Sequence, residues 1–331
     1  MGRLVITFSR NVFLPVTTIC RNRCGYCGFR KDVDDREAYL LSPDEVEGTL
    51  IKGSASSEAL FTFGEHPDIF PAVRERLKDL GYSSFLDYVI SLNKLALSLG
   101  KLPHTNPGIV SYQELKRLRR TNVSLGLMLE TTAEVDAHVS SPGKVPALRI
   151  EMIENAGKLK IPFTTGILVG IGESETDRDA SLKVIKDIHD EYGHIQEVII
   201  QNFSPKPGTE MAGAASPRPE VTLKTVSLSR KVLGDDIPIQ VPPNLSSSLR
   251  PLVESGASDL GGISSITPDF INPEHPWPTL DELKMTLSDC IFKERLPIYP
   301  KYVLDRWYHK DLKSILKRYV DKDGYRIKDH T

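Results

Sequence analysis

Several features that mark whole classes of protein are scarce or missing in this sequence of 331 residues. Its 42 Lys and Arg nearly balance its 44 Asp and Glu, which leaves a formal net charge of −2 and indicates no strongly basic surface for nucleic acid. No apolar run reaches the roughly eighteen residues that a membrane-spanning helix needs. The N-terminus lacks the layout of a signal peptide, and Ile6 breaks the myristoylation pattern after Gly2. We therefore expect a cytoplasmic protein with no nucleic-acid or membrane partner.

Cysteine is also scarce, and its distribution is uneven. Of the four cysteines, Cys20, Cys24 and Cys27 lie together, whereas Cys290 is far along the chain. In a reducing compartment, a close group of cysteines is more often a metal or redox site than a disulfide framework. The group therefore indicates metal chemistry.

Short apolar runs alternate with amphipathic stretches along the chain. Strands are expected at 14–20, 59–64, 102–106, 124–130, 163–169, 197–203, 237–241 and 259–266. The clearest helices are expected at 42–52, 83–99, 112–119, 146–158, 174–192 and 221–233, and a weaker one at 245–255. This α/β alternation predicts a TIM-type (β/α)8 barrel, with a partial (β/α)6 barrel as the alternative.

We expect two parts in the chain, a barrel domain over residues 1–295 and a helical C-terminal extension over residues 296–331 that packs on the barrel. In a parallel barrel, the loops that follow the strands carry the active site. The cysteine loop would be the first of these loops.

The cysteine loop, Cys20-Arg21-Asn22-Arg23-Cys24-Gly25-Tyr26-Cys27, suits an iron–sulfur cluster. Thiolates are the natural ligands of such clusters, and three of them leave one iron of a 4Fe-4S cubane open. A structural zinc site usually has four protein ligands, often as two Cys pairs. No second Cys pair and no nearby Cys/His pair is present, which argues against zinc. A thioredoxin-like pair, Cys24 and Cys27, would leave Cys20 unexplained.

This spacing, with Tyr26 directly before the third cysteine, resembles the signature of the radical S-adenosylmethionine (SAM) superfamily. The resemblance implies that SAM chelates the open iron. It also implies that one electron from the cluster cleaves SAM to methionine and a 5′-deoxyadenosyl radical, which takes a hydrogen atom from the substrate.

The same resemblance implies further cofactor-binding residues. Phe63-Gly64-Glu65 is similar to the Gly-Gly-Glu motif that receives the SAM amino group. Glu130 stands where an acid contacts SAM in the biotin-synthase-like branch, and Arg149, seventeen residues before Gly166, has the spacing of the arginine that pairs with the SAM carboxylate. Gly166 and Gly170 belong to a stretch similar to the one that lies along the adenine. A third glycine is missing after Gly172, so a dinucleotide fingerprint is rejected.

Five segments, at 11–15, 102–108, 161–168, 201–209 and 271–278, resemble a narrower family, the CofG subunits that form the deazaflavin chromophore of coenzyme F-420. The likeness runs from about residue 6 to about residue 297. It implies an ammonia-releasing lyase that closes a ring in an adduct of a hydroxybenzyl group and a ribityl-aminouracil. The adduct would come from the sister subunit CofH, and ferredoxin or flavodoxin would supply electrons.

Such a substrate needs neutral hydrogen-bonding groups in an apolar pocket. His104 is the candidate for proton transfer during ammonia loss. The candidates for substrate contact are Asn106, Gln201, Asn202, Asn244, Thr267 and Asp269. Two other functions stay open: another biotin-synthase-like or hydrogenase-maturase-like radical SAM enzyme, and a non-catalytic iron–sulfur or zinc protein.

Overall fold

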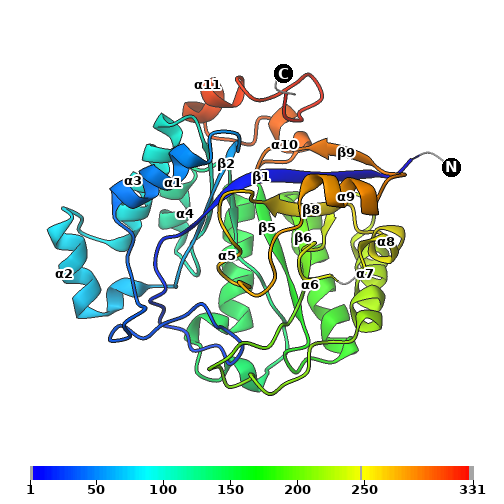
Figure 1. The fold of residues 1–331 in the computed structure, drawn as a ribbon, viewed down its shortest axis with the longest axis horizontal. Coiled ribbons are helices and arrows are strands. Elements are labelled where there is room, and N and C mark those ends of the chain that lie inside the picture. The colour runs from blue at the N-terminus through cyan, green and yellow to red at the C-terminus, as the bar shows by residue number, and fades with distance from the viewer. Residues whose placement is uncertain (1–2, 247, 328–331) are drawn as a thin grey trace.

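A computed structural model describes residues 3–246 and 248–327, and it contains a closed barrel of parallel strands (Figure 1). The eight barrel strands are β1 (Val5–Pro15), β2 (Glu58–Thr62), β3 (Leu102–Asn106), β4 (Ser124–Gly126), β5 (Phe163–Val169), β6 (Ile195–Asn202), β7 (Ile239–Gln240) and β8 (Asp259–Ile263). Each pairs with the next in chain order, and β1 closes the circle by pairing with both β8 and β2. The eight-stranded prediction is confirmed.

Helices follow the strands on the outside of the barrel. They are α1 (Pro43–Lys52), α2 (Pro71–Asp79), α3 (Phe85–Ser98), α4 (Tyr112–Leu118), α5 (Pro146–Lys158), α6 (Glu175–Tyr192), α7 (Pro219–Leu233), α8 (Leu249–Glu254) and α9 (Leu280–Thr286). Capping boxes begin four of them, including α6, where Ser174 Oγ accepts from the Asp177 N–H. The apolar faces of these helices and of the strands form one large core.

The first strand differs from its prediction. It was expected at 14–20, but β1 runs from Val5 to Pro15. Asn11 to Pro15 pair with β2, whereas Val5 to Phe8 pair with a ninth strand, β9 (Ile291–Glu294), which was not among the expected strands. The prediction was wrong here because β9 is short and its burial pattern shows no buried face that periodicity would reveal.

The segment after β9 covers the N-terminal end of the barrel. It contains α10 (Pro300–Leu304) and α11 (Lys313–Leu316), which lie beyond β9 at one end of the molecule (Figure 1). Leu296, Ile298 and Tyr302 pack with Leu102 and Val123, which begin or precede barrel strands. The division into parts 1–295 and 296–331 stays a prediction.

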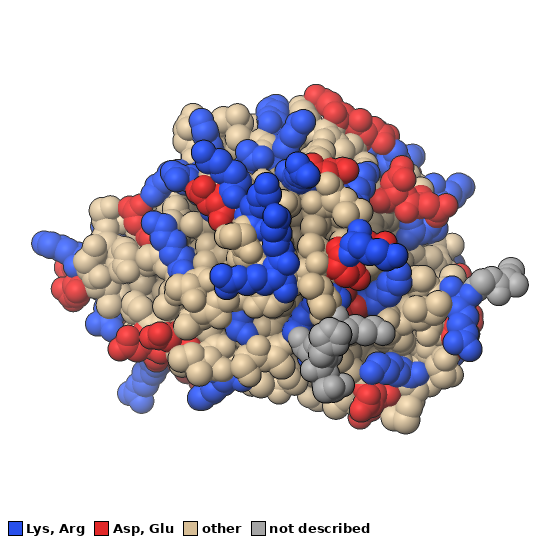
Figure 2. Space-filling view, turned by 90° about the horizontal axis from the view of Figure 1, so that it is seen from above, with Lys and Arg blue, Asp and Glu red and all other residues tan. Residues whose placement is uncertain are grey.

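Seen from above in the orientation of Figure 1, basic side chains are frequent, with acidic ones among them (Figure 2).

Candidate active site

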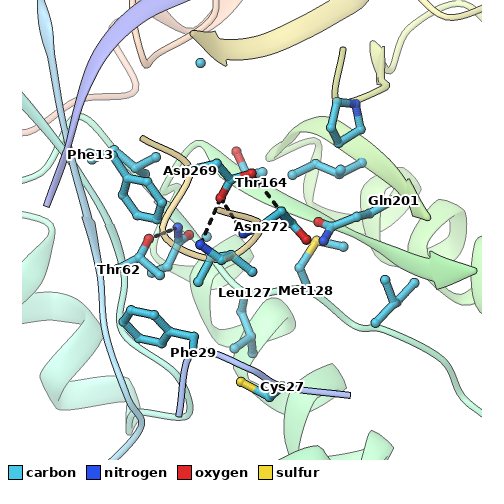
Figure 3. A pocket seen from close by; sticks show the side chains of 18 of the residues that line it. Phe13, Cys27, Phe29, Thr62, Leu127, Met128, Thr164, Gln201, Asp269 and Asn272 are labelled. Carbon is cyan, nitrogen blue, oxygen red and sulfur yellow. Dashed lines mark hydrogen bonds between the residues drawn. The ribbon is translucent and has the colours of Figure 1, made fainter. Parts of the chain in front are cut away.

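One cavity of about 410 Å³ joins the cysteine loop to the interior of the barrel (Figure 3). All three clustered cysteines line it, together with side chains from the barrel strands. Its apolar walls include Phe13, Phe29 and Leu127, which Figure 3 labels together with Cys27. The sequence therefore placed the cysteine loop correctly at the end of the barrel where the strands finish.

Backbone hydrogen bonds fix the cysteine loop between neighbouring βα loops. The N–H of Arg21 donates to Glu65 O, that of Arg23 to Ser140 O and that of Gly25 to Ala137 O. Glycine is required beside the loop, because a Cβ at Gly64 would lie 2.0 Å from Ile19 O and 2.7 Å from Cys20 Cβ. Gly64 is thus needed for close packing whether or not it touches a ligand.

The sulfur atoms receive hydrogen bonds that favour thiolates. Cys20 Sγ accepts from the N–H groups of Glu65 at 3.1 Å and Asn22 at 3.4 Å, and Ser141 Oγ lies 3.3 Å from Cys24 Sγ. Burial nevertheless raises the pKa of Cys20 to about 11 and also raises the pKa of Cys27. Iron cations would offset this cost of burying negative sulfur, because a coordinating thiol gives up its proton.

Glu65 is held by other protein groups. Its carboxylate accepts from Arg21 Nε at 2.8 Å and from the Ile109 N–H at 2.9 Å. Burial opposes ionisation, but these two donors outweigh it and lower the pKa of Glu65. The side chain therefore stays a carboxylate at the edge of the cavity.

Glu130, Lys144 and Arg149 form a buried charged group between β4 and α5. Lys144 Nζ donates to Glu130 Oε1, and Arg149 Nη2 lies 3.9 Å from the same oxygen. Burial opposes ionisation of Glu130, yet the two cations outweigh it and lower its pKa. Arg149 also donates to Met128 O at 2.5 Å and to Gly143 O at 2.7 Å. The sequence prediction found Glu130 and Arg149 but missed Lys144.

Tyr26 lies between the cysteine loop and this charged group. Its hydroxyl is 3.1 Å from His138 Nε2, and Lys144 Nζ lies 5.9 Å from the centre of its ring. Burial, with Glu130 next, raises the pKa of Tyr26, so the phenol is neutral. The tyrosine side chain fixes the position of the loop beside Lys144.

Gly166 and Gly170, which were predicted to lie along the adenine of SAM, have packing roles in the structure. A Cβ at Gly166 would lie 2.2 Å from Ile199 O, so the glycine allows β5 to approach β6. Gly170 has φ +100° and faces Pro217. Neither belongs to the residues that line the cavity, and their contact with SAM stays a prediction.

The predicted substrate residues divide into two groups. Asn106, Gln201, Asn202 and Asp269 line the cavity, whereas Asn244 and Thr267 do not. Asn244 Nδ2 instead donates to Asp269 Oδ2 at 2.9 Å, and Thr267 Oγ1 accepts from the Phe13 N–H at 3.0 Å. Both residues therefore bond to residues that line the cavity and do not line it themselves, and their contact with the substrate stays a prediction.

His104 lies inside β3, with its side chain in the barrel. Its Nδ1 is 2.7 Å from Ser124 Oγ, and its Nε2 is 3.2 Å from Asn106 Oδ1. Burial lowers the pKa of His104 to about 4, so the imidazole is neutral at pH 7. So low a pKa makes the ring a weak base as well as keeping it neutral, and its role in proton transfer stays a prediction.

Several lining residues escaped the sequence analysis. They are Ser9, Asn11, Glu58, Glu197, Gln240, Trp277 and Arg295. The inward-facing alternation of β1 (Ser9, Asn11, Phe13) would have revealed part of this set had the strand been placed at Val5–Pro15. Arg295 gives no such signal, because it comes from the segment after β9.

The residues present fit a cubane cluster. Three thiols from one loop line the same wall of the cavity, and N–H and O–H donors point at two of the sulfurs. Within residues 3–246 and 248–327, no three or more His, Cys, Asp or Glu side chains lie close enough together to hold a single metal ion. A cubane is wider than one ion and can bridge thiols that are farther apart.

Comparison with known proteins agrees with this site. The family model described as the radical SAM superfamily matches residues 14–185. The chain is 55% identical over 324 residues to a 7,8-didemethyl-8-hydroxy-5-deazariboflavin synthase of Methanoculleus marisnigri, covering 97% of each chain. It is 50% identical to the synthase of the same name from Archaeoglobus fulgidus, covering 97% of this chain and 98% of that one.

A solved structure shares the fold. The FeFe-hydrogenase maturase HydG from Carboxydothermus hydrogenoformans is 19% identical, with a TM-score of 0.66 over 96% of this chain and 78% of that one. Among the described residues, no helix is both long and apolar enough to cross a membrane.

Proposed function

The chain belongs to the radical SAM superfamily and, within it, to the family of 7,8-didemethyl-8-hydroxy-5-deazariboflavin synthases, and on this basis we propose how it makes that deazaflavin. The observation that carries the proposal is the single cavity that joins three cysteines to a hollow, polar barrel interior. A cofactor at the cysteines and an organic substrate in the barrel would therefore meet in one enclosed space.

The chain's own residues are suited to holding the cofactors. Cys20, Cys24 and Cys27 would bind three irons of a 4Fe-4S cluster. SAM carries an ammonium group and a carboxylate, and the cavity offers the carboxylates of Glu65 and Glu130 for the first and the cations of Lys144 and Arg149 for the second. When bound, the cluster and SAM supply a 5′-deoxyadenosyl radical that abstracts hydrogen.

The substrate in this proposal is the adduct of a hydroxybenzyl group and a ribityl-aminouracil, and the hydrogen leaves its benzylic carbon. Ring closure then expels ammonia, and loss of one further electron and a proton completes the oxidation to the deazaflavin, with the oxidised ferredoxin or flavodoxin able to accept that electron. The loss of ammonia would make the enzyme a carbon–nitrogen lyase. The apolar walls around Phe13 and Phe29 would hold aromatic rings and exclude water from the reacting carbon. Asn106, Gln201 and Asp269 provide neutral and acidic groups for hydrogen bonds to the uracil.

The proposal also requires partners. The adduct would come from CofH, either by diffusion or by contact between subunits, and a ferredoxin or flavodoxin would reduce the cluster. The reaction would take place in the cytoplasm.

An anaerobic assay tests the function. The protein is reconstituted with iron and sulfide, reduced, and mixed with SAM and the CofH product. We expect 5′-deoxyadenosine, ammonia and the fluorescent deazaflavin. Deoxyadenosine without deazaflavin would reject the substrate and favour another biotin-synthase-like enzyme. A fully assembled cluster that gives neither product would favour the non-catalytic alternative.

A further inference from the structure

The barrel interior is open, whereas most TIM-type barrels fill theirs with layers of large side chains. Gly126 and Gly262 line the cavity in β4 and β8. A Cβ at Gly126 would lie 2.2 Å from Asn106 Oδ1, and a Cβ at Gly262 would lie 2.2 Å from Asn11 Nδ2. The two glycines therefore leave the space that amide side chains from β1 and β3 occupy.

The part of the cavity around Asn11 is polar, and we call it the lower lumen. The lower lumen is lined by Ser9, Asn11, Glu58, Gln240 and Arg295, and His104 lies just above it. The strand register places Asn11 beside Glu58, the first residue of β2, so both lie toward the end of the barrel away from the cysteines. These side chains are buried, except for that of Gln240, which is half-buried.

The segment after β9 closes the lower lumen from beneath. Arg295 donates to Asp259 Oδ2 at 2.7 Å and to Glu197 Oε2 at 3.0 Å. Pro297 O accepts from Ser124 Oγ at 2.6 Å and from Gln196 Nε2 at 3.0 Å. The guanidinium of Arg295 is thus paired with protein carboxylates, and the side chain closes the lower end of the cavity as its floor.

Other groups in the lower lumen keep unused hydrogen-bonding capacity. Asn11 is 1% exposed, and its Oδ1 has no hydrogen-bond partner among the residues the structure describes. Ser9 Oγ donates to Glu58 Oε2 at 2.5 Å. Burial raises the pKa of Glu58 to about 7, so its carboxyl group both donates and accepts near neutral pH. A buried polar atom without a hydrogen-bond partner, such as Asn11 Oδ1, costs free energy. A ligand with hydroxyl groups would supply the missing hydrogen bond.

We propose that the lower lumen binds the ribityl chain of the substrate through Asn11, Ser9 and Glu58. This inference rests on the proposed function and adds an orientation to it. A polyol carries donors and acceptors on successive carbons, which matches the neighbouring amide, hydroxyl and carboxyl groups of the lower lumen. With the polyol at the floor, the ring system lies against the apolar wall of Phe13 and Phe29, beside the cysteine loop (Figure 3).

The test uses two fluorescent probes and the anaerobic holoenzyme. One probe is the deazaflavin product, which keeps the ribityl chain, and the other is the same ring system with a methyl group in place of that chain. Fluorescence titration gives the Kd of each probe for the wild type and for Asn11→Leu, Glu58→Gln and Phe13→Leu. Thermal unfolding and cluster absorbance check that each variant is folded and loaded.

We expect the wild type to bind the ribityl probe at least about tenfold more tightly than the methyl probe. Asn11→Leu and Glu58→Gln should each remove most of this preference and leave the Kd of the methyl probe within about twofold. Phe13→Leu, the matched control at the apolar wall, should weaken both probes by the same factor.

Two results would overturn the inference: equal Kd values for both probes in the wild type, or equal losses for both probes in Asn11→Leu and Glu58→Gln. Neither result depends on turnover. Failure of the proposed function would show separately, as a wild-type enzyme that forms no deazaflavin from the adduct.

Discussion

At the scale of single residues, the site contains side chains that sequence motifs identify and others that only the folded structure brings together. The three cysteines, Glu65 and Arg149 carry motif spacing, and all five line one cavity. Lys144 has no such signal, because its contact with Glu130 depends on how the loop after β4 folds back. Asn11 and Glu58 were missed because the strands predicted at 14–20 and 59–64 left both residues out, although they belong to β1 and β2.

The first prediction concerns Cys24. Cys24→Ala should abolish cluster assembly, because two thiolates cannot hold the cubane. Iron and sulfide content and the visible absorbance of the reconstituted protein measure this. Cys290→Ala is the matched control, since Cys290 lies outside the cavity, and it should keep the full iron content. A normal iron content in Cys24→Ala would remove Cys24 from the cluster.

The second prediction concerns the pH dependence of stability. Burial lowers the pKa of His104 from 6.5 to about 4, so the unfolded chain binds a proton more readily than the folded chain between these values. The free energy of unfolding should therefore fall as pH drops from about 6.5 to about 4, by up to about 3 kcal/mol from this residue.

His104→Gln should remove this contribution. Denaturant unfolding of both proteins at pH 7.5 and pH 5 measures it, and the wild type should lose more stability than the variant. Equal losses would show that His104 is not held neutral by the fold. His138 has a similarly lowered pKa and remains in both proteins, so it cancels in the comparison.

At the scale of elements, the strands and helices of the barrel follow from local patterns, and the exceptions have physical causes. β3, β5 and α5 have the predicted bounds, because a proline stands at one end of each: Pro107 after β3, Pro162 before β5 and Pro146 at the start of α5. β1 was displaced because the apolar residues of 14–20 continue past Pro15 into the cysteine loop, where Val16 and Ile19 are buried without forming the strand. β9 exists only through its pairing with β1.

The floor element yields the third prediction. Arg295→Met should destabilise the protein by about 3–5 kcal/mol, because it leaves Glu197 and Asp259 buried without their cation. The matched control is Arg250→Met, which breaks an exposed pair with Asp289 and should cost less than about 1 kcal/mol. Denaturant unfolding compares the two. Similar losses in both variants would mean that the buried network does not hold the floor.

At the scale of the whole molecule, the barrel places two kinds of chemistry at opposite ends of one cavity. The βα loops carry the thiols and the charged groups, and the segment after β9 closes the other end. The residues at the cysteine-loop end could be predicted from the sequence, because active-site loops follow barrel strands. Those at the other end could not, because Arg295 is brought to the barrel by pairing between residues nearly three hundred positions apart in the chain.

The measurement that tests this account most directly follows one hydrogen atom. The adduct is prepared with deuterium on its benzylic carbon and turned over once by the reduced holoenzyme with SAM, and the 5′-deoxyadenosine is examined by mass spectrometry. If SAM and the substrate share the cavity as proposed, the deoxyadenosine gains one deuterium and deazaflavin forms with it. Unlabelled deoxyadenosine alongside deazaflavin would contradict the account, because the hydrogen would then come from another atom.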